Sequence, residues 1–357
     1  MRANSLFHLI ILTGVLTMNA KSESEVPLYP DKFDLLHFLD AEGRRIPVDS
    51  IEKWKIRRAH ILANFQLVAG PVPGNERRIP ADVRVLEETR EEKYVRRKIT
   101  FASEPGDRVT AWVLIPHGAG AGAPGALCLH QTVSIGKDEP VGLGGKPNLR
   151  YASELAERGY VAIAPDYPNY GEYKCDPYAL GYASATMKGI WNHMRAVDVL
   201  QSLPEVAKDK IVCIGHSLGG HNSIFISVFD ERIKAVVSSC GFNSFARYYG
   251  GDLTGWSHNG YMPRIAGAYE KNPQKMPFDF TELVGALAPR RFFTNSPTRD
   301  ANFEVSGVRD CIAAAAPVYK LFGADGHLVA VHPDAEHDFP PEIRKQAYEF
   351  LDRAVGK

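Results

Sequence analysis

The chain has 357 residues, of which 45% are hydrophobic and 24% are charged, as in ordinary globular proteins. Its 42 basic residues balance its 42 acidic residues, and no basic stripe with interleaved aromatic residues is present. The composition therefore argues against a nucleic-acid partner. The length allows one large α/β domain or two small domains.

The N-terminus has the pattern of a secretory signal peptide. Arg2 precedes an apolar run from Leu6 to Met18, and polar residues follow Ala20. This run is too short to span a membrane comfortably. We therefore predict that residues 1–20 are a signal peptide, and that the mature protein is secreted or periplasmic without a membrane span. An anchor helix that stays uncleaved is the alternative.

Residues 21–90 are predicted to form a helical lead-in that packs on the main domain. Within this range, residues 49–66 carry apolar side chains at helical spacing, although Ile56 falls off the apolar face. Pro71, Pro73 and Gly74 then break the helix.

Residues 91–357 have the pattern of a single α/β domain. Residues 93–116 are predicted to form paired strands around a turn at 104–107. Further strands are predicted at 126–129, 160–164, 211–214, 233–239, 291–295 and 328–332, and helices at 151–158, 184–203, 221–229 and 346–353. This alternation predicts a mostly parallel sheet with helices on both faces. Functional residues are then expected at the carboxyl ends of the strands.

One stretch, at about 242–283, interrupts this alternation and is rich in aromatic residues and glycine. Its position after a strand end predicts a cap or insertion over the functional site. Trp256 within it, and Tyr167 after the strand at 160–164, are candidate substrate-binding residues. The alternative is that the aromatic rings form only the insertion's own small core.

Ser217 is the candidate nucleophile. The strand at 211–214 runs into Gly215-His216-Ser217-Leu218-Gly219, and a helical segment follows. A strand, a Gly-x-Ser-x-Gly turn and a helix form a nucleophile elbow, which exposes the serine at a helix N-terminus. The alternative is a serine in an ordinary glycine-rich loop.

A serine nucleophile needs a base, and the base needs an acidic partner, in the chain order Ser, Asp or Glu, His. His337 is the best candidate base, because it lies on the loop after the last predicted strand. Asp300 is the best candidate acid, because it follows the strand at 291–295. The rival residues are His221, His258, His327 and His332 for the base, and Asp252, Glu304 and Asp310 for the acid.

The oxyanion of an acyl-transfer intermediate needs two backbone N–H donors. In a nucleophile elbow one is the amide of the residue after the serine, here Leu218. The second is expected from the loop after the strand at 126–129, and we favour the amide of Thr132.

The five cysteines, an odd number, argue against a fold built on disulfides. Three of them, Cys128, Cys213 and Cys240, lie in or at the end of strand-like runs and are expected to be buried thiols. Cys175 and Cys311 could form a disulfide. No dinucleotide fingerprint or metalloprotease motif occurs, so neither a metal nor an organic cofactor is expected.

Four segments resemble those of the α/β-hydrolase superfamily: 128–132, 164–167, 215–221 and 335–339. The chain is most similar to the branch of dienelactone hydrolases and acetyl xylan esterases, over residues 90–355. The resemblance implies an eight-stranded core sheet and hydrolysis of carboxylic esters. Gln131 stands where a glycine is usual after the histidine of the oxyanion loop. The nucleophile is serine and not the cysteine of dienelactone hydrolases, which favours ordinary esters.

Glucuronoyl esterases are also relatives in this neighbourhood, but their elbow carries a cysteine and an arginine around the serine. Here these positions hold His216 and Leu218. The sequence thus predicts a secreted serine esterase, with carbohydrate or plant-derived esters (acetyl, feruloyl or glucuronoyl) as possible substrates. A serine peptidase of the same fold and a non-catalytic binding protein are the alternatives.

Overall fold

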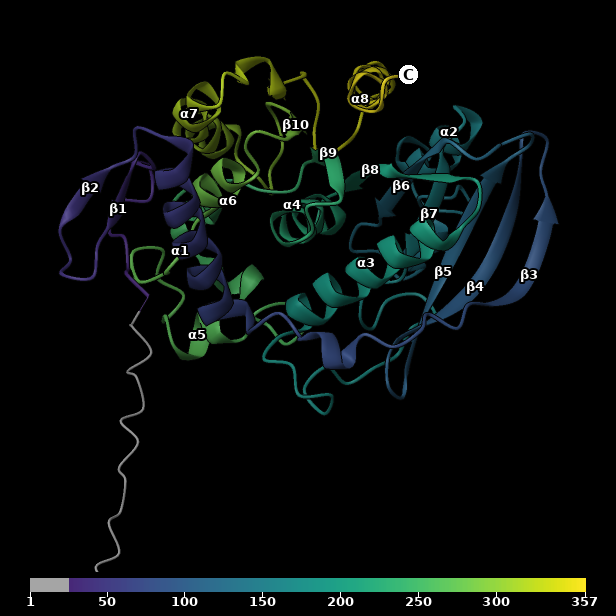
Figure 1. Cartoon of the computed structure of the whole chain (residues 1–357), viewed down its shortest axis with the longest axis horizontal. Helices are drawn as coiled ribbons and strands as arrows, with labels where there is room; N and C mark the ends of the chain where they lie inside the picture. Colours follow the sequence, from purple (N-terminus) through teal and green to yellow (C-terminus); the bar gives the residue numbers. More distant parts are fainter. Residues whose placement is uncertain (1–25) are drawn as a thin grey trace, which may run out of the picture.

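A computed structural model describes residues 26–357, and a nine-stranded sheet forms its centre, in the order β11-β10-β9-β8-β6-β7-β5-β4-β3 (Figure 1). The strands are β3 (Arg84–Arg90), β4 (Tyr94–Glu104), β5 (Asp107–Pro116), β6 (Ala123–Leu129), β7 (Val161–Pro165), β8 (Val206–His216), β9 (Ile233–Ser239), β10 (Arg291–Asn295) and β11 (Leu328–Val331). Strands β6 to β11 pair in parallel, whereas β3, β4 and β5 are antiparallel to their neighbours. The prediction of a mostly parallel α/β sheet is confirmed.

The sheet has one strand more than the eight expected. The additional strand is β3, at the edge of the sheet, and it lies inside the stretch predicted as a helical lead-in. Most of its residues are exposed, and four of its seven are charged. A strand without a buried face lacks the alternation of apolar and polar residues by which strands are recognised.

Helices cover both faces of the sheet. Helices α3 (Ala185–Ser202) and α4 (Leu218–Phe229) pack on one face, and α2 (Tyr151–Glu157) and α8 (Pro341–Val355) on the other. Side chains alternate along β8 accordingly. Ile211 and Cys213 join the hydrophobic cluster that contains α3 and α4, whereas Val212 and Ile214 join the cluster that contains α2 and α8.

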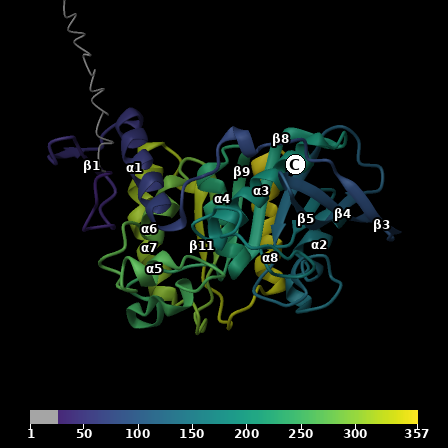
Figure 2. The same cartoon turned by 90° about the horizontal axis from the view of Figure 1, so that it is seen from below.

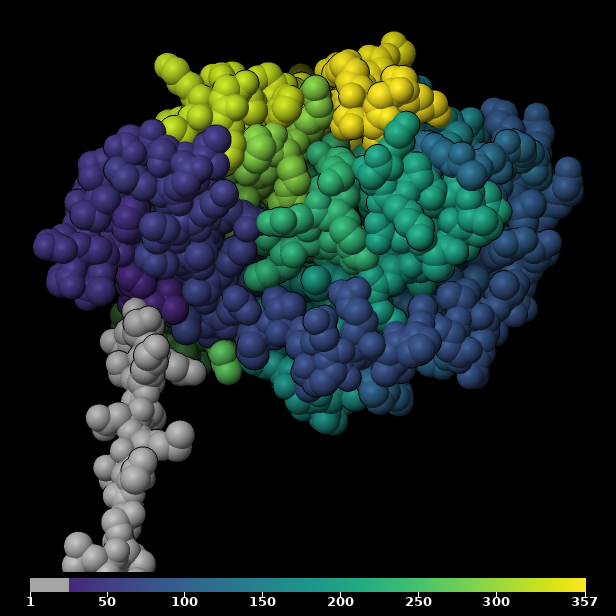
Figure 3. Space-filling model, in the orientation of Figure 1, coloured from purple at the N-terminus to yellow at the C-terminus, as the bar shows by residue number. Residues whose placement is uncertain are grey.

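The N-terminal segment covers the end of the molecule opposite β3 (Figures 2 and 3). It forms a hairpin of β1 (His37–Leu39) and β2 (Arg45–Pro47), and then α1 (Ile51–Ala69). Ser50 caps α1 by accepting a hydrogen bond from the Lys53 amide. The helix predicted over residues 49–66 is therefore present. The division of the chain into domains at residue 90 stays a prediction.

The predicted insertion lies between β9 and β10 and contains the short helices η4 (Tyr248–Gly251), η5 (Leu253–Trp256) and α5 (Arg264–Gly267). It continues into α6 (Phe280–Ala286), and α7 (Val305–Leu321) follows β10. The rings of Phe245, Trp256, Phe278 and Phe280 are buried and pack on one another. Phe278 also packs on Phe65 of α1, and Phe280 on Phe225 of α4, so these rings join the insertion to the main hydrophobic core.

A buried ion pair links α1 to α6, which lie side by side in Figure 1. The Arg57 guanidinium donates to Glu282 over 2.5 Å, and both side chains are fully buried. Burial raises the pKa of Glu282, and the positive charge of Arg57 opposes that rise. The guanidinium also stacks 3.5 Å from the centre of the Tyr29 ring.

We predict that Arg57→Met destabilises the fold by about 3 kcal/mol, because it leaves the Glu282 carboxyl buried without its partner. Lys53→Met is the matched control on the same helix, since its ion pair with Asp49 is largely exposed and contributes at most about 1 kcal/mol. Urea unfolding of both variants measures the two losses. Equal losses would contradict the prediction.

Three further points of the sequence analysis bear on the fold. All five cysteines are free thiols, so Cys175 and Cys311 are not bonded to each other. The predicted signal peptide, residues 1–20, lies outside the described residues. Within residues 26–357, no helix combines the length and the apolar character that crossing a membrane requires.

Candidate active site

Ser217 stands at the junction of β8 and α4 in a strained backbone conformation. Its φ is 53° and its ψ is −115°. Residues other than glycine rarely adopt this backbone conformation, which costs about 1–3 kcal/mol. Its amide donates to the Ser239 carbonyl over 2.8 Å, which ties the turn to the end of β9. Ser217 is buried, with 8% of its surface exposed, so it is less open to solvent than the elbow motif predicts.

Two glycines make this turn possible. A Cβ atom on Gly215 would lie 2.2 Å from the Gly219 carbonyl oxygen, and one on Gly219 would lie 1.9 Å from the Leu129 carbonyl oxygen. Backbone therefore touches backbone where β8, α4 and the end of β6 meet. The elbow pattern Gly-x-Ser-x-Gly is explained by this close approach.

We predict that Gly219→Ala prevents folding or destabilises the protein by more than about 3 kcal/mol, because main chain would have to move to admit the methyl group. Gly267→Ala is the matched control, since a Cβ at that helical glycine meets nothing within 4 Å. Soluble yield and thermal unfolding distinguish the two variants. A Gly219→Ala protein as stable as the control would contradict this reading of the turn.

Asp300 and His337 come together at the carboxyl edge of the sheet. Asp300 lies on the loop after β10, and His337 on the loop after β11. The His337 Nδ1 is 3.0 Å from both carboxylate oxygens of Asp300. The carboxylate side chain is 1% exposed and the imidazole is 24% exposed, so the pair has a buried end and an open end.

Backbone amides complete the surroundings of the Asp300 carboxylate. Asn302 and Phe303 donate to its Oδ1 over 2.8 and 3.1 Å. Burial raises the pKa of the carboxyl, but the hydrogen bond and charge of His337, together with these amides, hold it below the ordinary value. Asp300 is not paired with its neighbour Arg299, which instead forms an ion pair with Asp334.

The rival residues lie in other environments. Three of the four rival histidines contact a backbone carbonyl through Nδ1: His221 that of Gly241, His327 that of Pro289 and His332 that of Ser296. The fourth, His258, accepts a hydrogen bond from the Gly260 amide. Among the acids, Asp252 caps η5, Glu304 contacts the Ser306 hydroxyl and Asp310 pairs with Arg247. The part of the chain that is described shows no histidine–carboxylate hydrogen bond for any of them.

His216 connects the elbow to the Asp300–His337 pair. Its ring meets the His337 ring edge to face, with the ring centres 4.8 Å apart, and it directly precedes Ser217. No hydrogen bond joins the Ser217 hydroxyl to His337 within residues 26–357. Such bonds are often long in the absence of substrate and shorten when it binds.

The two candidate oxyanion donors lie on segments that touch. Leu218 begins α4, so its amide is one of the first N–H groups of a helix, which have no partner within it. Thr132 lies on the loop after β6, and the last residue of β6, Leu129, packs against Gly219 of α4. Thr132 is exposed, and its hydroxyl lies 3.3 Å from that of Tyr261 in the insertion.

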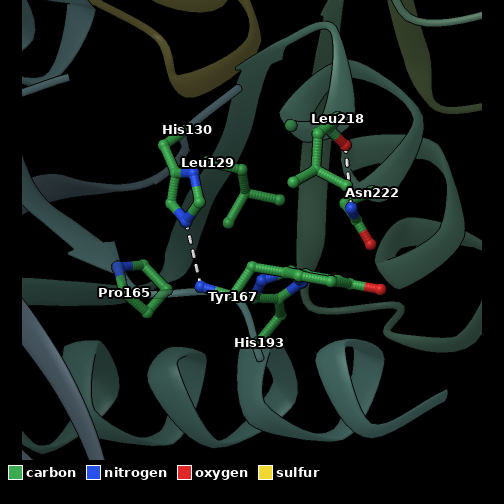
Figure 4. Close-up of a pocket in the computed structure, with 8 residues that line it drawn as sticks. Leu129, His130, Pro165, Tyr167, His193, Leu218 and Asn222 are labelled. Atoms are coloured by element: carbon green, nitrogen blue, oxygen red, sulfur yellow. Dashed lines mark hydrogen bonds between the residues drawn. The ribbon is translucent and has the colours of Figure 1, made fainter. Parts of the chain in front are cut away.

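His130 fixes the start of this loop. The Tyr167 amide donates to the His130 Nε2 over 2.9 Å (Figure 4). The His130 Nδ1 contacts the Gln131 carbonyl over 2.6 Å. Because Nε2 accepts a hydrogen bond, the proton resides on Nδ1 and the ring is neutral. Burial lowers the pKa of His130, which agrees with a neutral ring. His130 therefore joins the ends of β6 and β7.

Tyr167 and Trp256, the two candidate substrate-binding residues, are each 2% exposed. The Tyr167 hydroxyl donates to the Gly260 carbonyl over 3.1 Å. The Trp256 ring packs edge to face on His221, with the ring centres 4.7 Å apart. Both side chains thus connect the insertion to the sheet edge and to α4, and neither ring is open to solvent.

Two residues that the sequence did not single out hold the candidate loops in place. The Asn295 side chain donates to the Ser239 hydroxyl and to the Asp338 carbonyl, next to His337. The buried carboxylate of Glu139 accepts from the Gln131 side chain and the Lys146 amide. Only the position of Asn295 at a predicted strand end could have drawn attention to it.

Parts of the chain are similar in sequence to known proteins. A family model described as glucuronyl esterase, fungi, matches residues 178–323. The chain is 26% identical over 197 residues to a 4-O-methyl-glucuronoyl methylesterase of Phanerochaete carnosa, a match that covers 49% of this chain and 48% of that protein. The chain spans between 37% and 68% of the length of the first curated relatives that it matches.

Solved structures show the same fold. A glucuronoyl esterase from Solibacter usitatus is 20% identical with a TM-score of 0.72, over 94% of this chain and 100% of that one. A putative acetyl xylan esterase from Bacteroides fragilis is 20% identical with a TM-score of 0.60, over 85% of this chain and 86% of that one. The chain thus shares the α/β-hydrolase fold of these solved esterases, and its residues 178–323 are similar in sequence to the glucuronyl esterase family.

Proposed function

We propose that the protein is a serine hydrolase that cleaves carboxylic esters through an acyl-enzyme. The observation that carries this proposal is the combination of a strained serine at the β8–α4 junction and a buried Asp300–His337 pair at the same edge of the sheet. A serine in an ordinary loop would need neither the strain nor the close backbone packing around it.

In the proposed mechanism, the Ser217 hydroxyl attacks the ester carbonyl carbon while His337 accepts its proton through Nε2. The Asp300 carboxylate accepts a hydrogen bond from the His337 Nδ1–H group and stabilises the imidazolium that forms. The Leu218 and Thr132 amides stabilise the negative charge on the carbonyl oxygen. His337 then protonates the departing alkoxide, and later takes a proton from the water that hydrolyses the acyl-enzyme.

We further propose that the substrate is an ester on a carbohydrate or a plant-derived compound, with acetyl, feruloyl and glucuronoyl esters as candidates. The relatives named for glucuronoyl and acetyl xylan ester hydrolysis support this substrate class. Leu218 is apolar and 1% exposed, so the elbow offers its amide but no cationic side chain to the acyl group. Export through the predicted signal peptide of residues 1–20 would bring the enzyme to such substrates.

A substrate panel tests this proposal. It comprises acetylated xylan, a feruloyl ester, a glucuronoyl ester, a short-chain aryl ester and an aminoacyl amide, each incubated with wild type and with Ser217→Ala. We expect Ser217-dependent hydrolysis of the aryl ester and of at least one carbohydrate ester, and none of the amide. Cleavage of the amide alone would favour the peptidase alternative, and no cleavage of any substrate would contradict the proposed function.

A further inference from the structure

Three side chains with metal-binding atoms converge beside the candidate nucleophile. One ring nitrogen of His216, one of His337 and the Cys240 sulfur all lie within 4.8 Å of one another. They come from three places in the sequence, namely the end of β8, the residue after β9 and the loop after β11. Two imidazoles and a thiolate are ligands that Zn²⁺ prefers, and three protein ligands leave a fourth position for water.

The hydrogen bonds of His216 leave one of its two ring nitrogens without a partner within residues 26–357. The side chain is fully buried, and its Nδ1 is 2.9 Å from the Ser239 hydroxyl. Its Nε2 is buried and has no hydrogen-bond partner within residues 26–357. A buried polar atom without a partner costs free energy. A metal ion bound to this nitrogen would remove that cost.

Cys240 is held in place by the backbone. It has a positive φ of 48°, and its amide donates to the Asn295 carbonyl over 2.8 Å. Its thiol donates to the Asp338 carbonyl over 3.3 Å. These contacts fix the sulfur next to the loop that carries His337.

Two negative charges beside the cluster would offset a divalent cation, and they act against one positive charge, the exposed Lys146 ammonium, which donates to the His337 carbonyl over 3.4 Å. When Zn²⁺ binds, Cys240 loses its proton to solvent and supplies one negative charge. The Asp300 carboxylate, in contact with His337, supplies the second. A buried cation is tolerated when such charges compensate it. The partly exposed His337 ring is the side from which an ion enters.

We propose that His216, Cys240 and His337 form a binding site for Zn²⁺ or a similar thiophilic divalent cation, and that the bound ion withdraws His337 from catalysis. The inhibition rests on the proposed function, whereas the binding does not. The ion would therefore be a reversible inhibitor, and its removal by a chelator would restore the hydrolase.

The binding test uses Ser217→Ala protein, so that turnover plays no part. Titration calorimetry with Zn²⁺ is expected to give one ion per chain, and Co²⁺ is expected to produce the near-ultraviolet charge-transfer band of a cobalt–thiolate bond. Adding Cys240→Ser, which keeps a donor for the Asp338 carbonyl, should abolish the band and weaken Zn²⁺ binding at least tenfold. Adding Cys175→Ser should change neither, because that half-buried thiol lies outside the cluster. His216→Gln is the second variant if Cys240→Ser does not fold.

The activity test uses wild-type protein and a short-chain aryl ester. Saturating Zn²⁺ is expected to reduce hydrolysis at least tenfold, a chelator to restore it, and Cys240→Ser to be resistant. Binding that neither Cys240→Ser nor His216→Gln weakens would overturn the site. If the wild type hydrolyses no ester, the proposed function fails, but the calorimetry and the cobalt spectrum still decide whether the metal site exists.

Discussion

Replacing Ser217 with alanine is expected to reduce kcat for ester hydrolysis by about 10⁵- to 10⁶-fold, as expected for the loss of a serine nucleophile. The fold should remain intact, because the Ser217 side chain makes no hydrogen bond within the described residues and alanine is no larger. Steady-state kinetics measures the loss, and thermal unfolding verifies that the variant is folded.

Ser223→Ala is the matched control for this experiment. Ser223 lies on the same helix, α4, and its buried hydroxyl donates to the Gly219 carbonyl over 2.8 Å. We expect its kcat to stay within a few-fold of wild type. A Ser217→Ala enzyme with activity near that of the control would show that the hydrolysis does not depend on an acyl-enzyme at Ser217.

Replacing Asp300 with asparagine is expected to reduce kcat by about 10⁴-fold. Asparagine has almost the same shape, but it can present an N–H group to His337 Nδ1 where the carboxylate accepts a hydrogen bond. The imidazole would then hold its proton on Nε2, where it cannot accept the Ser217 proton. Asp310→Asn is the matched control, since that carboxylate is half-exposed and, within residues 26–357, its one ion pair is with Arg247 over 3.5 Å. Equal activity of the two variants would remove Asp300 from the mechanism.

The same substitution should change how stability depends on pH. The folded protein holds the pKa of Asp300 below its ordinary value, so folding favours the ionised carboxylate. Its contribution to the free energy of unfolding is therefore complete above the ordinary carboxyl pKa of about 3.9, and it is lost as the pH falls through the lower folded pKa. Asp300→Asn should lose stability at neutral pH and show a weaker decline below about pH 4 than wild type.

The parallel part of the sheet could be predicted because β6 to β10 each contain a short apolar run, although in β8 (Val206–His216) this run is only the second half of the strand, and the charged first half could not be recognised. The elbow motif and the predicted strand ends restrict the candidate nucleophile, acid and base to a few positions. The sequence therefore indicates Ser217, Asp300 and His337 for these roles. The Asp300–His337 hydrogen bonds agree with that choice, whereas the catalytic roles stay predictions. The edge strand β3 could not be recognised, since almost all of its side chains face solvent.

The contacts that hold the site together could not be predicted. Such contacts are made by Asn295, Glu139 and Cys240, whose side chains meet their partners only when distant segments fold together. Trp256 was chosen for its ring, but its burial depends on how Phe245 and Phe280 pack around it. Sequence spacing carries no information about such packing, which is set by the three-dimensional arrangement of the insertion.

The central claim is that Ser217 is an activated nucleophile. Its most direct test is to react the wild-type protein with a fluorophosphonate and to locate the adduct by mass spectrometry of the digested chain. We predict one adduct per chain, on Ser217, and its absence after His337→Ala. A folded wild-type protein that does not react, or an adduct on another residue, would contradict the account.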